Sequence, residues 1–143
     1  MTSPAATENI GFNPISEISA YFSNTAAKID KSEIGLYKGL EFLFHSHPKM
    51  TKQLSNIGDM GESQRLTKEV SDVIASVAYE DMASAFAAWC HRMVLEYVYQ
   101  SDNSNEKLRN LLTDLKQCRI FGSTAMGPGT ANFLAGSEIP VEA

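Results

Sequence analysis

Apolar residues recur at helical spacing over most of the first 119 positions. We expect a first helix to begin at Asn13 and Pro14, since Asn is a good N-cap and Pro suits the first helical turn. The break at 30–32 ends it, and a second helix is expected to end before Pro48. The apolar positions of these two helices are Ile15, Ile18, Phe22, Ala26, Ile29, Leu36, Leu40 and Leu43. Gly35 and Gly39 either allow close backbone packing or weaken the second helix.

The next segments are a doubtful short helix over 49–57, a turn over 58–61, and a strongly amphipathic helix from Ser63. Residues 79–81 interrupt the pattern, and Asp81 is placed to cap the following helix. That helix, 82–100, is apolar on several sides, which is typical of a central, largely buried helix. Its Met and aromatic stripe predicts core packing. The stripe consists of Phe86, Trp89, Met93 and Tyr97.

A last helix is expected after a capping box formed by Asn103 and Glu106. It carries a stripe of leucines up to about Leu115. The pattern contains no convincing strand before residue 120, although 137–141 could start one. The sequence therefore predicts an all-α fold, a helical bundle of about five helices. We expect 1–12 to be a disordered arm and 13–119 to be the bundle domain, with a glycine-rich loop over 120–143.

Composition and charge exclude several classes of protein. The 143 residues are 43% hydrophobic and 20% charged, as in ordinary globular domains. A net charge of −5 with scattered basic residues argues against nucleic-acid binding. The N-terminus lacks the features of a signal peptide, and no apolar run is long enough to span a membrane. Two distant cysteines, Cys90 and Cys118, are expected to be reduced thiols, which favours a cytoplasmic location.

Two sets of reactive side chains have ordinary structural interpretations. His45 and His47 precede Pro48, where histidines interact favourably with a helix C-terminus, and no carboxylate completes a metal site. We expect no metal. Cys90 and His91 are adjacent on a helix and point about 100° apart, so they cannot act as a nucleophile and its base. We interpret Cys90 as a core residue and His91 as a helix histidine with satisfied hydrogen bonds, with a pocket-lining role as the alternative.

The run 121–130 (FGSTAMGPGT) is the stretch most suited to a ligand. Its small residues, hydroxyl groups and glycines allow a flat or anionic molecule to approach the backbone closely. The spacing of Gly122 and Gly127 is that of a phosphate loop, but Pro128 and Gly129 stand where Lys and Ser or Thr are needed. A nucleotide triphosphate site is therefore rejected. A ligand loop and a flexible tail remain equally compatible with the chemistry of these residues.

Two segments resemble the acyl-CoA dehydrogenase superfamily. Residues 73–91 (VIASVAYEDMASAFAAWCH) resemble a stretch of the family's N-terminal helical domain. Residues 124–131 (TAMGPGTA) lie over the family's flavin-contacting TEPGAGSD loop, with three identities, at Thr124, Gly127 and Gly129. Thr130 replaces the serine, while Ala125, Met126 and Ala131 depart from the pattern, and the family's PEEYGGxG segment is missing.

The resemblance implies a flavoprotein that uses FAD to dehydrogenate acyl-CoA thioesters between Cα and Cβ. This chain would hold the helical domain and the opening of a β domain. By resemblance, the cofactor-binding residues are Phe121, Ser123, Thr124, Gly129 and Thr130. No glutamate here matches the family's catalytic base, so we expect no catalytic residue in this chain and no tight FAD binding by the chain alone.

The expected partners are an acyl-CoA substrate and either a second copy or a complementary dehydrogenase subunit. The chain would be a natural fragment, a split subunit or a truncated form. An incomplete bundle should expose apolar surface, which favours self-association. The alternatives are a non-catalytic helical interaction module and an unrelated helical protein with a glycine-rich tail.

Overall fold

The computed structural model describes residues 12–54, 58–101 and 105–123, and within them the fold is all-helical, with five α-helices, one 3₁₀ helix and no strand. The prediction of a helical bundle of about five helices is confirmed. Of the three predicted segments, the bundle is covered almost completely, whereas 1–11 and 124–143 lie outside the described residues. The elements are α1 (Ser16–Asp30), α2 (Leu36–Ser46), η1 (Pro48–Thr51), α3 (Met60–Glu80), α4 (Met82–Gln100) and α5 (Glu106–Lys116).

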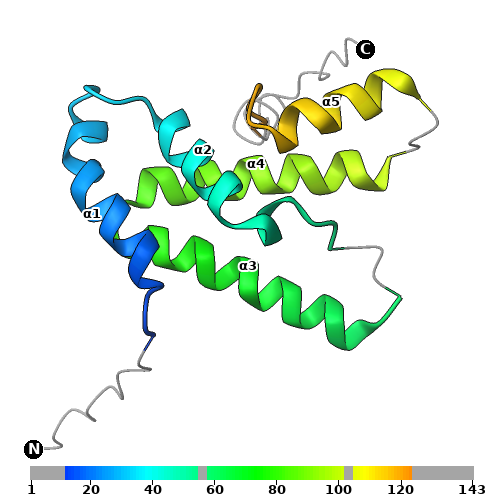
Figure 1. The fold of residues 1–143 in the computed structure, drawn as a ribbon, viewed down its shortest axis with the longest axis horizontal. Helices are drawn as coiled ribbons and strands as arrows, with labels where there is room; N and C mark the ends of the chain where they lie inside the picture. The colour runs from blue at the N-terminus through cyan, green and yellow to red at the C-terminus, as the bar shows by residue number, and fades with distance from the viewer. Residues whose placement is uncertain (1–11, 55–57, 102–104, 124–143) are drawn as a thin grey trace, which may run out of the picture.

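Helix α4 is the centre of the bundle (Figure 1). It forms a hairpin with α3, and it also packs against α2, α5 and η1. Helix α1 packs mainly on α3, at the end of the molecule where α3 leads into α4 (Figure 1). The core is built from the inward apolar stripes of these helices. Its completely buried side chains include Ile18, Phe22, Leu43, Met50, Val77, Leu95 and Leu115.

A single residue, Asp81, joins α3 to α4. Its Oδ1 accepts the backbone N–H groups of Ala83 and Ser84 at 3.0 and 3.1 Å, and its Oδ2 accepts the Ser84 hydroxyl at 2.6 Å. These contacts satisfy N–H groups that have no partner inside the helix. The predicted capping role of Asp81 is confirmed.

The two other predicted caps are wrong. Helix α1 begins at Ser16 after Ile15, which makes no side-chain cap; instead, the Ile15 N–H donates to the hydroxyl of the buried Ser76 on α3 at 2.9 Å. A contact of the residue before α1 with α3 thus replaces the local Asn13 cap. Helix α5 is capped by Asn105, whose side chain accepts the N–H of Lys107 at 2.9 Å.

Of the predicted short helix over 49–57, the structure describes 49–54, where a 3₁₀ turn, η1, ends at Thr51 and no α-helix forms; 55–57 lie outside the described residues. This segment is held to α4 by polar contacts. Arg92 donates to the carbonyl of Lys52, and Glu96 accepts the N–H of Leu54 at 3.0 Å. Arg92 and Glu96 also pair with each other at 3.0 Å. Because these backbone groups bond to side chains of α4, the segment stays in place without a regular helix.

Gly39 allows a close approach of α2 to α1. A Cβ atom at this position would lie 2.8 Å from Cε1 of the completely buried Phe22. The close-packing explanation is therefore correct for Gly39. At Gly35, a Cβ would meet only the exposed ring of Tyr37.

Helix α4 is buried on three sides and exposed on the fourth, so the prediction that its Met and aromatic stripe packs in the core is wrong. Phe86 is 62% exposed, Tyr97 53% and Trp89 37%, and Met82 extends the stripe with 69% exposed. The helices α2, α3 and α5 take up the other sides of α4. Its inward residues include Ala85, Ala88, Leu95 and Val98. The outer side therefore carries large apolar side chains that the described parts of the chain leave exposed.

Candidate functional site

The residues that precede the predicted glycine-rich loop are fixed to the centre of the bundle. The backbone N–H of Gly122 donates to Nδ1 of His91 on α4 at 3.0 Å. A Cβ at Gly122 would lie 2.6 Å from Cβ and Cγ1 of Val94, one turn further along α4. Only glycine lets the backbone come this close without a shift, so the position of this segment depends on Gly122.

His91 is completely buried and uses both ring nitrogens. Because Nδ1 accepts a hydrogen bond, the proton of the neutral ring is on Nε2, which donates to the carbonyl of Leu115 at 3.2 Å. Burial lowers the pKa of His91, and the nearby Arg92 charge acts in the same direction, whereas the bond to Leu115 opposes them. The prediction of a satisfied helix histidine is confirmed, and this residue connects α4, α5 and the lead-in segment.

Two of the five predicted FAD contacts lie within the described residues. The ring of Phe121 is 39% exposed, 5.6 Å from the ring of His91 and 6.5 Å from the ring of Tyr37. Ser123 is exposed at the end of the described chain. The remaining three, Thr124, Gly129 and Thr130, lie outside the described residues, so their predicted contacts stay predictions.

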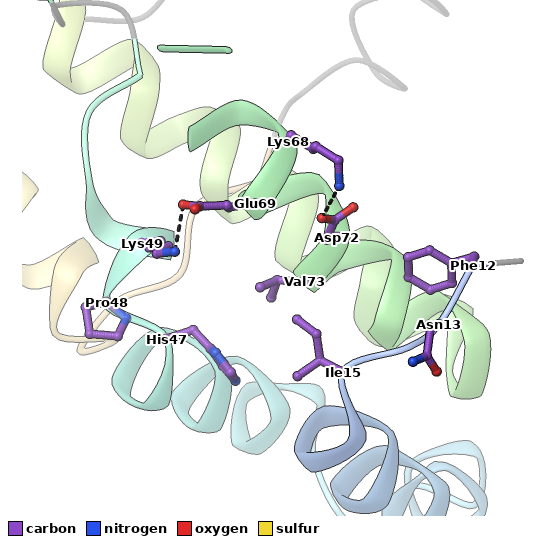
Figure 2. A pocket seen from close by; sticks show the side chains of 10 residues that line it. All are labelled: Phe12, Asn13, Ile15, His47, Pro48, Lys49, Lys68, Glu69, Asp72 and Val73. Carbon is purple, nitrogen blue, oxygen red and sulfur yellow. Dashed lines mark hydrogen bonds and ion pairs between the residues drawn. The ribbon is translucent and has the colours of Figure 1, made fainter. Parts of the chain in front are cut away.

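A second candidate site is an open cavity of about 470 Å³ between the segment before α1, the turn η1 and helix α3. Figure 2 shows Ile15, just before α1, and Val73, on α3, close together in the middle of this cavity. Phe12 and Pro48 add apolar surface on either side. The floor is therefore apolar and contributed by residues far apart in the sequence.

Two ion pairs form the polar rim of this cavity (Figure 2). Lys49 pairs with Glu69 at 2.7 Å, and Lys68 pairs with Asp72 at 2.6 Å. The hydrogen bond from Lys49 lowers the pKa of the Glu69 carboxyl. The two lysines are offset by two carboxylates, so the four charged side chains of the rim carry no net charge.

His47 also lines this cavity. Its Nε2 is buried and has no hydrogen-bond partner among the described residues, and its ring meets the Phe42 ring edge-on at 6.3 Å. His45 is exposed. Within the described ranges, no group of three histidine, cysteine or acidic side chains could hold a metal ion.

Cys90 and Cys118 form no disulfide, and both are buried. Burial raises the pKa of the Cys118 thiol to about 11. A thiol with so high a pKa is a poor nucleophile near neutral pH. The interpretation of Cys90 as a core residue agrees with its 3% exposure.

The sequence pattern pointed to 121–130 and missed the cavity. The lining residues Asn13, His47 and Lys68 come from three separate segments and form no motif. None of the helices in the described part of the chain is long and apolar enough to cross a membrane. Neither protein-family models, nor curated proteins, nor solved structures give a significant match to this chain.

Proposed function

We propose that this chain supplies the helical part of an acyl-CoA dehydrogenase-like flavoprotein and presents the residues from Phe121 onward to FAD. The observation that carries the proposal is the bond between His91 and Gly122. It fixes the start of the glycine-rich loop to the most central helix. A loop that contacts a cofactor needs such a rigid support, because binding then costs less ordering of the chain.

The fold is consistent with this proposal at the level of its architecture. The resemblance calls for a helical domain that ends where a glycine-rich loop begins, and the described helices end at Lys116. The chain then turns at Cys118, which has a φ of 52° and donates its N–H to the carbonyl of Leu115. From this turn the backbone passes directly to Gly122.

The residues at this position suit FAD in kind. Phe121 offers a partly exposed aromatic ring, against which a flat ring system can lie. Tyr37 adds a second exposed ring beside it, and Ser123 adds an exposed hydroxyl group. By the resemblance, Thr124, Gly129 and Thr130 would complete the contacts. These residues bind and orient the cofactor.

When bound, FAD would supply the hydride acceptor for α,β-dehydrogenation of an acyl-CoA thioester. The chain itself would position the loop and exclude water from one side of the site. His91 cannot act as the base in this arrangement, since its two nitrogens hold the backbone of Gly122 and Leu115. No glutamate of this sequence matches the family's base, so the carboxylate that removes the α-proton is expected to come from outside these 143 residues.

Flavin binding is measured by gel filtration of the purified chain with FAD, alone and with a complementary dehydrogenase subunit. We expect no flavin absorbance with the chain alone, and acyl-CoA-dependent dye reduction with the complementing protein. A yellow isolated chain would contradict the requirement for further domains. Failure of every complementing subunit to restore activity would contradict the flavoprotein assignment.

Two glycine variants test the role of the anchor in the restored enzyme. Gly122→Ala forces the lead-in segment away from Val94 and should lower the restored activity. Gly58→Ala is the matched control, since a Cβ there meets nothing within 4 Å. Replacing Thr124 with Trp should abolish activity, and wild-type rates in that variant would refute the flavin-loop assignment.

A second candidate function, a non-catalytic interaction module, is favoured by the uncovered apolar side of α4. Such a module would bind another protein chain without any flavin. The two functions are distinguished by the complementation assay, since an interaction module forms a complex but never gains acyl-CoA-dependent activity.

A further inference from the structure

The exposed side of α4 carries one continuous row of large apolar side chains, which we call the α4 outer stripe. Successive members are separated by four, three, four and four residues, the spacing that keeps side chains on one face of a helix. The row is about 22 Å long at 1.5 Å per residue. Its members are Met82, Phe86, Trp89 and Tyr97, which are exposed, and Met93, which is half-buried between Trp89 and Tyr97. Rows of this kind on a protein surface mark interaction sites.

The α4 outer stripe is free of charge. The helix has two charged side chains, Arg92 and Glu96, and they pair with each other with only 4% and 14% of their side chains exposed. His91 is completely buried. The chain as a whole has a net charge of −5, so two copies repel each other over most of their surface. An uncharged face is where two copies meet with the least repulsion.

The stripe is also complementary to itself. In an antiparallel pair of identical helices related by a twofold axis, residues whose numbers have a constant sum face each other. With the axis beside Trp89, Met82 faces Tyr97 of the second copy, and Phe86 faces Met93 of the second copy. Each pair joins a methionine to an aromatic ring, a contact that is favourable. The antiparallel arrangement also opposes the two helix dipoles.

The exposed area of the stripe limits the size of such a contact. Aromatic side chains expose on the order of 200 Å² when free. At the observed exposures, the stripe offers about 400–500 Å² per copy, compared with about 800 Å² in a standard interface. The area therefore fits a weak, concentration-dependent dimer.

We propose that the α4 outer stripe binds the same stripe of a second copy of this chain, antiparallel, with the twofold axis beside Trp89. This interface is independent of the proposed flavin site, which lies on the side of α4 that carries His91 and contacts Gly122. Loss of one would leave the other in place.

Sedimentation equilibrium of the full chain without FAD measures the association. We expect a monomer–dimer equilibrium with a dissociation constant between about 10 and 500 µM, in keeping with the small area. A chain that remains monomeric at the top of this range overturns the proposal and leaves the stripe to another occupant, such as a different protein or residues 124–143. That result would not bear on the flavin assay.

Charged substitutions test the pairing itself. Phe86→Glu alone and Met93→Lys alone should each raise the dissociation constant about tenfold or more, because each places an unpaired charge in an apolar contact. An equimolar mixture of the two variants should recover association, since the new carboxylate then faces the new ammonium group. If the mixture stays as weak as the single variants, the antiparallel pairing is wrong.

Met60→Glu is the matched control. Met60 is 74% exposed at the start of α3, away from the stripe. The substitution adds the same negative charge as Phe86→Glu and should leave the dissociation constant unchanged. Equal weakening by Met60→Glu would attribute the effect to net charge and overturn the assignment of the interface. Circular dichroism of each variant should match that of the wild type, because Phe86 and Met60 are exposed and Met93 is half-buried outside the core.

Discussion

The backbone of Gly122 and the ring of His91 are joined by a hydrogen bond of 3.0 Å across 31 positions in the sequence. The bond needs an unprotonated Nδ1, so it exists only while His91 is neutral. Burial of the ring favours that state by lowering its pKa. The stability of the bundle and the position of the segment after α5 therefore both depend on Nδ1 of His91 remaining unprotonated.

The first prediction concerns pH. In the unfolded chain His91 has an ordinary pKa of about 6.5, and in the folded chain its pKa is lower, so unfolding takes up a proton below that pH. The contribution of His91 is fully present above about pH 6.5 and is lost as the pH falls towards the folded pKa, by up to about 1.4 kcal/mol per unit. Urea unfolding at a series of pH values measures this slope.

The variant His91→Gln should reduce that slope, while His45→Gln, on an exposed histidine, is the control. Other groups contribute to the slope equally in the wild type and in His91→Gln, so the difference between these two slopes isolates His91. A slope that is unchanged in His91→Gln would show that this histidine is protonated in the folded state as readily as in the unfolded chain.

The second prediction concerns the junction of α3 and α4. Asp81→Ala removes the acceptor of two backbone N–H groups and of the Ser84 hydroxyl, and should lower the free energy of unfolding by about 1–2 kcal/mol. Asp81→Asn keeps one carbonyl oxygen as a cap and should lose less. The free energy is measured by urea unfolding, and equal losses for both variants would argue against capping.

The third prediction concerns the contact between α1 and α2. Gly39→Ala gains up to about 1 kcal/mol of helix propensity, but it presses a methyl group against the buried ring of Phe22, which costs about 1–3 kcal/mol. We expect a net loss of stability. In the double variant with Phe22→Leu, the two losses should be less than additive in a thermodynamic cycle. Strict additivity would contradict a direct contact.

The fourth prediction concerns the end of α1. Ser32 is exposed and has a φ of 57°, in the region where glycine is favoured over residues with a Cβ. Ser32→Gly should stabilise the protein by about 0.5–1 kcal/mol. The matched change Ser23→Gly, on the exposed side of α1, should destabilise it by about 0.5–1 kcal/mol. Thermal unfolding compares the two, and a shift in the same direction for both would refute the explanation.

The helices and the α3–α4 junction could be predicted from the sequence because their signals are local. Apolar spacing, the interruption at 79–81 and the capping chemistry of Asp81 lie within a few residues of the structure they produce. The same holds for the all-helical class. For Gly39 the sequence left two explanations open, and only its contact with the distant Phe22 decided between them. The FAD contacts of the loop rest on resemblance and stay predictions.

Contacts between distant segments decided the rest. The start of α1 depends on a bond from Ile15 to Ser76, which no local pattern contains. The cavity joins residues from three segments, and the anchor of the loop joins His91 to Gly122. Helix α4 shows the reason most clearly. Apolar residues on several of its sides determine that it is central, but which side stays uncovered depends on where α2, α3 and α5 pack, and only the tertiary structure places them.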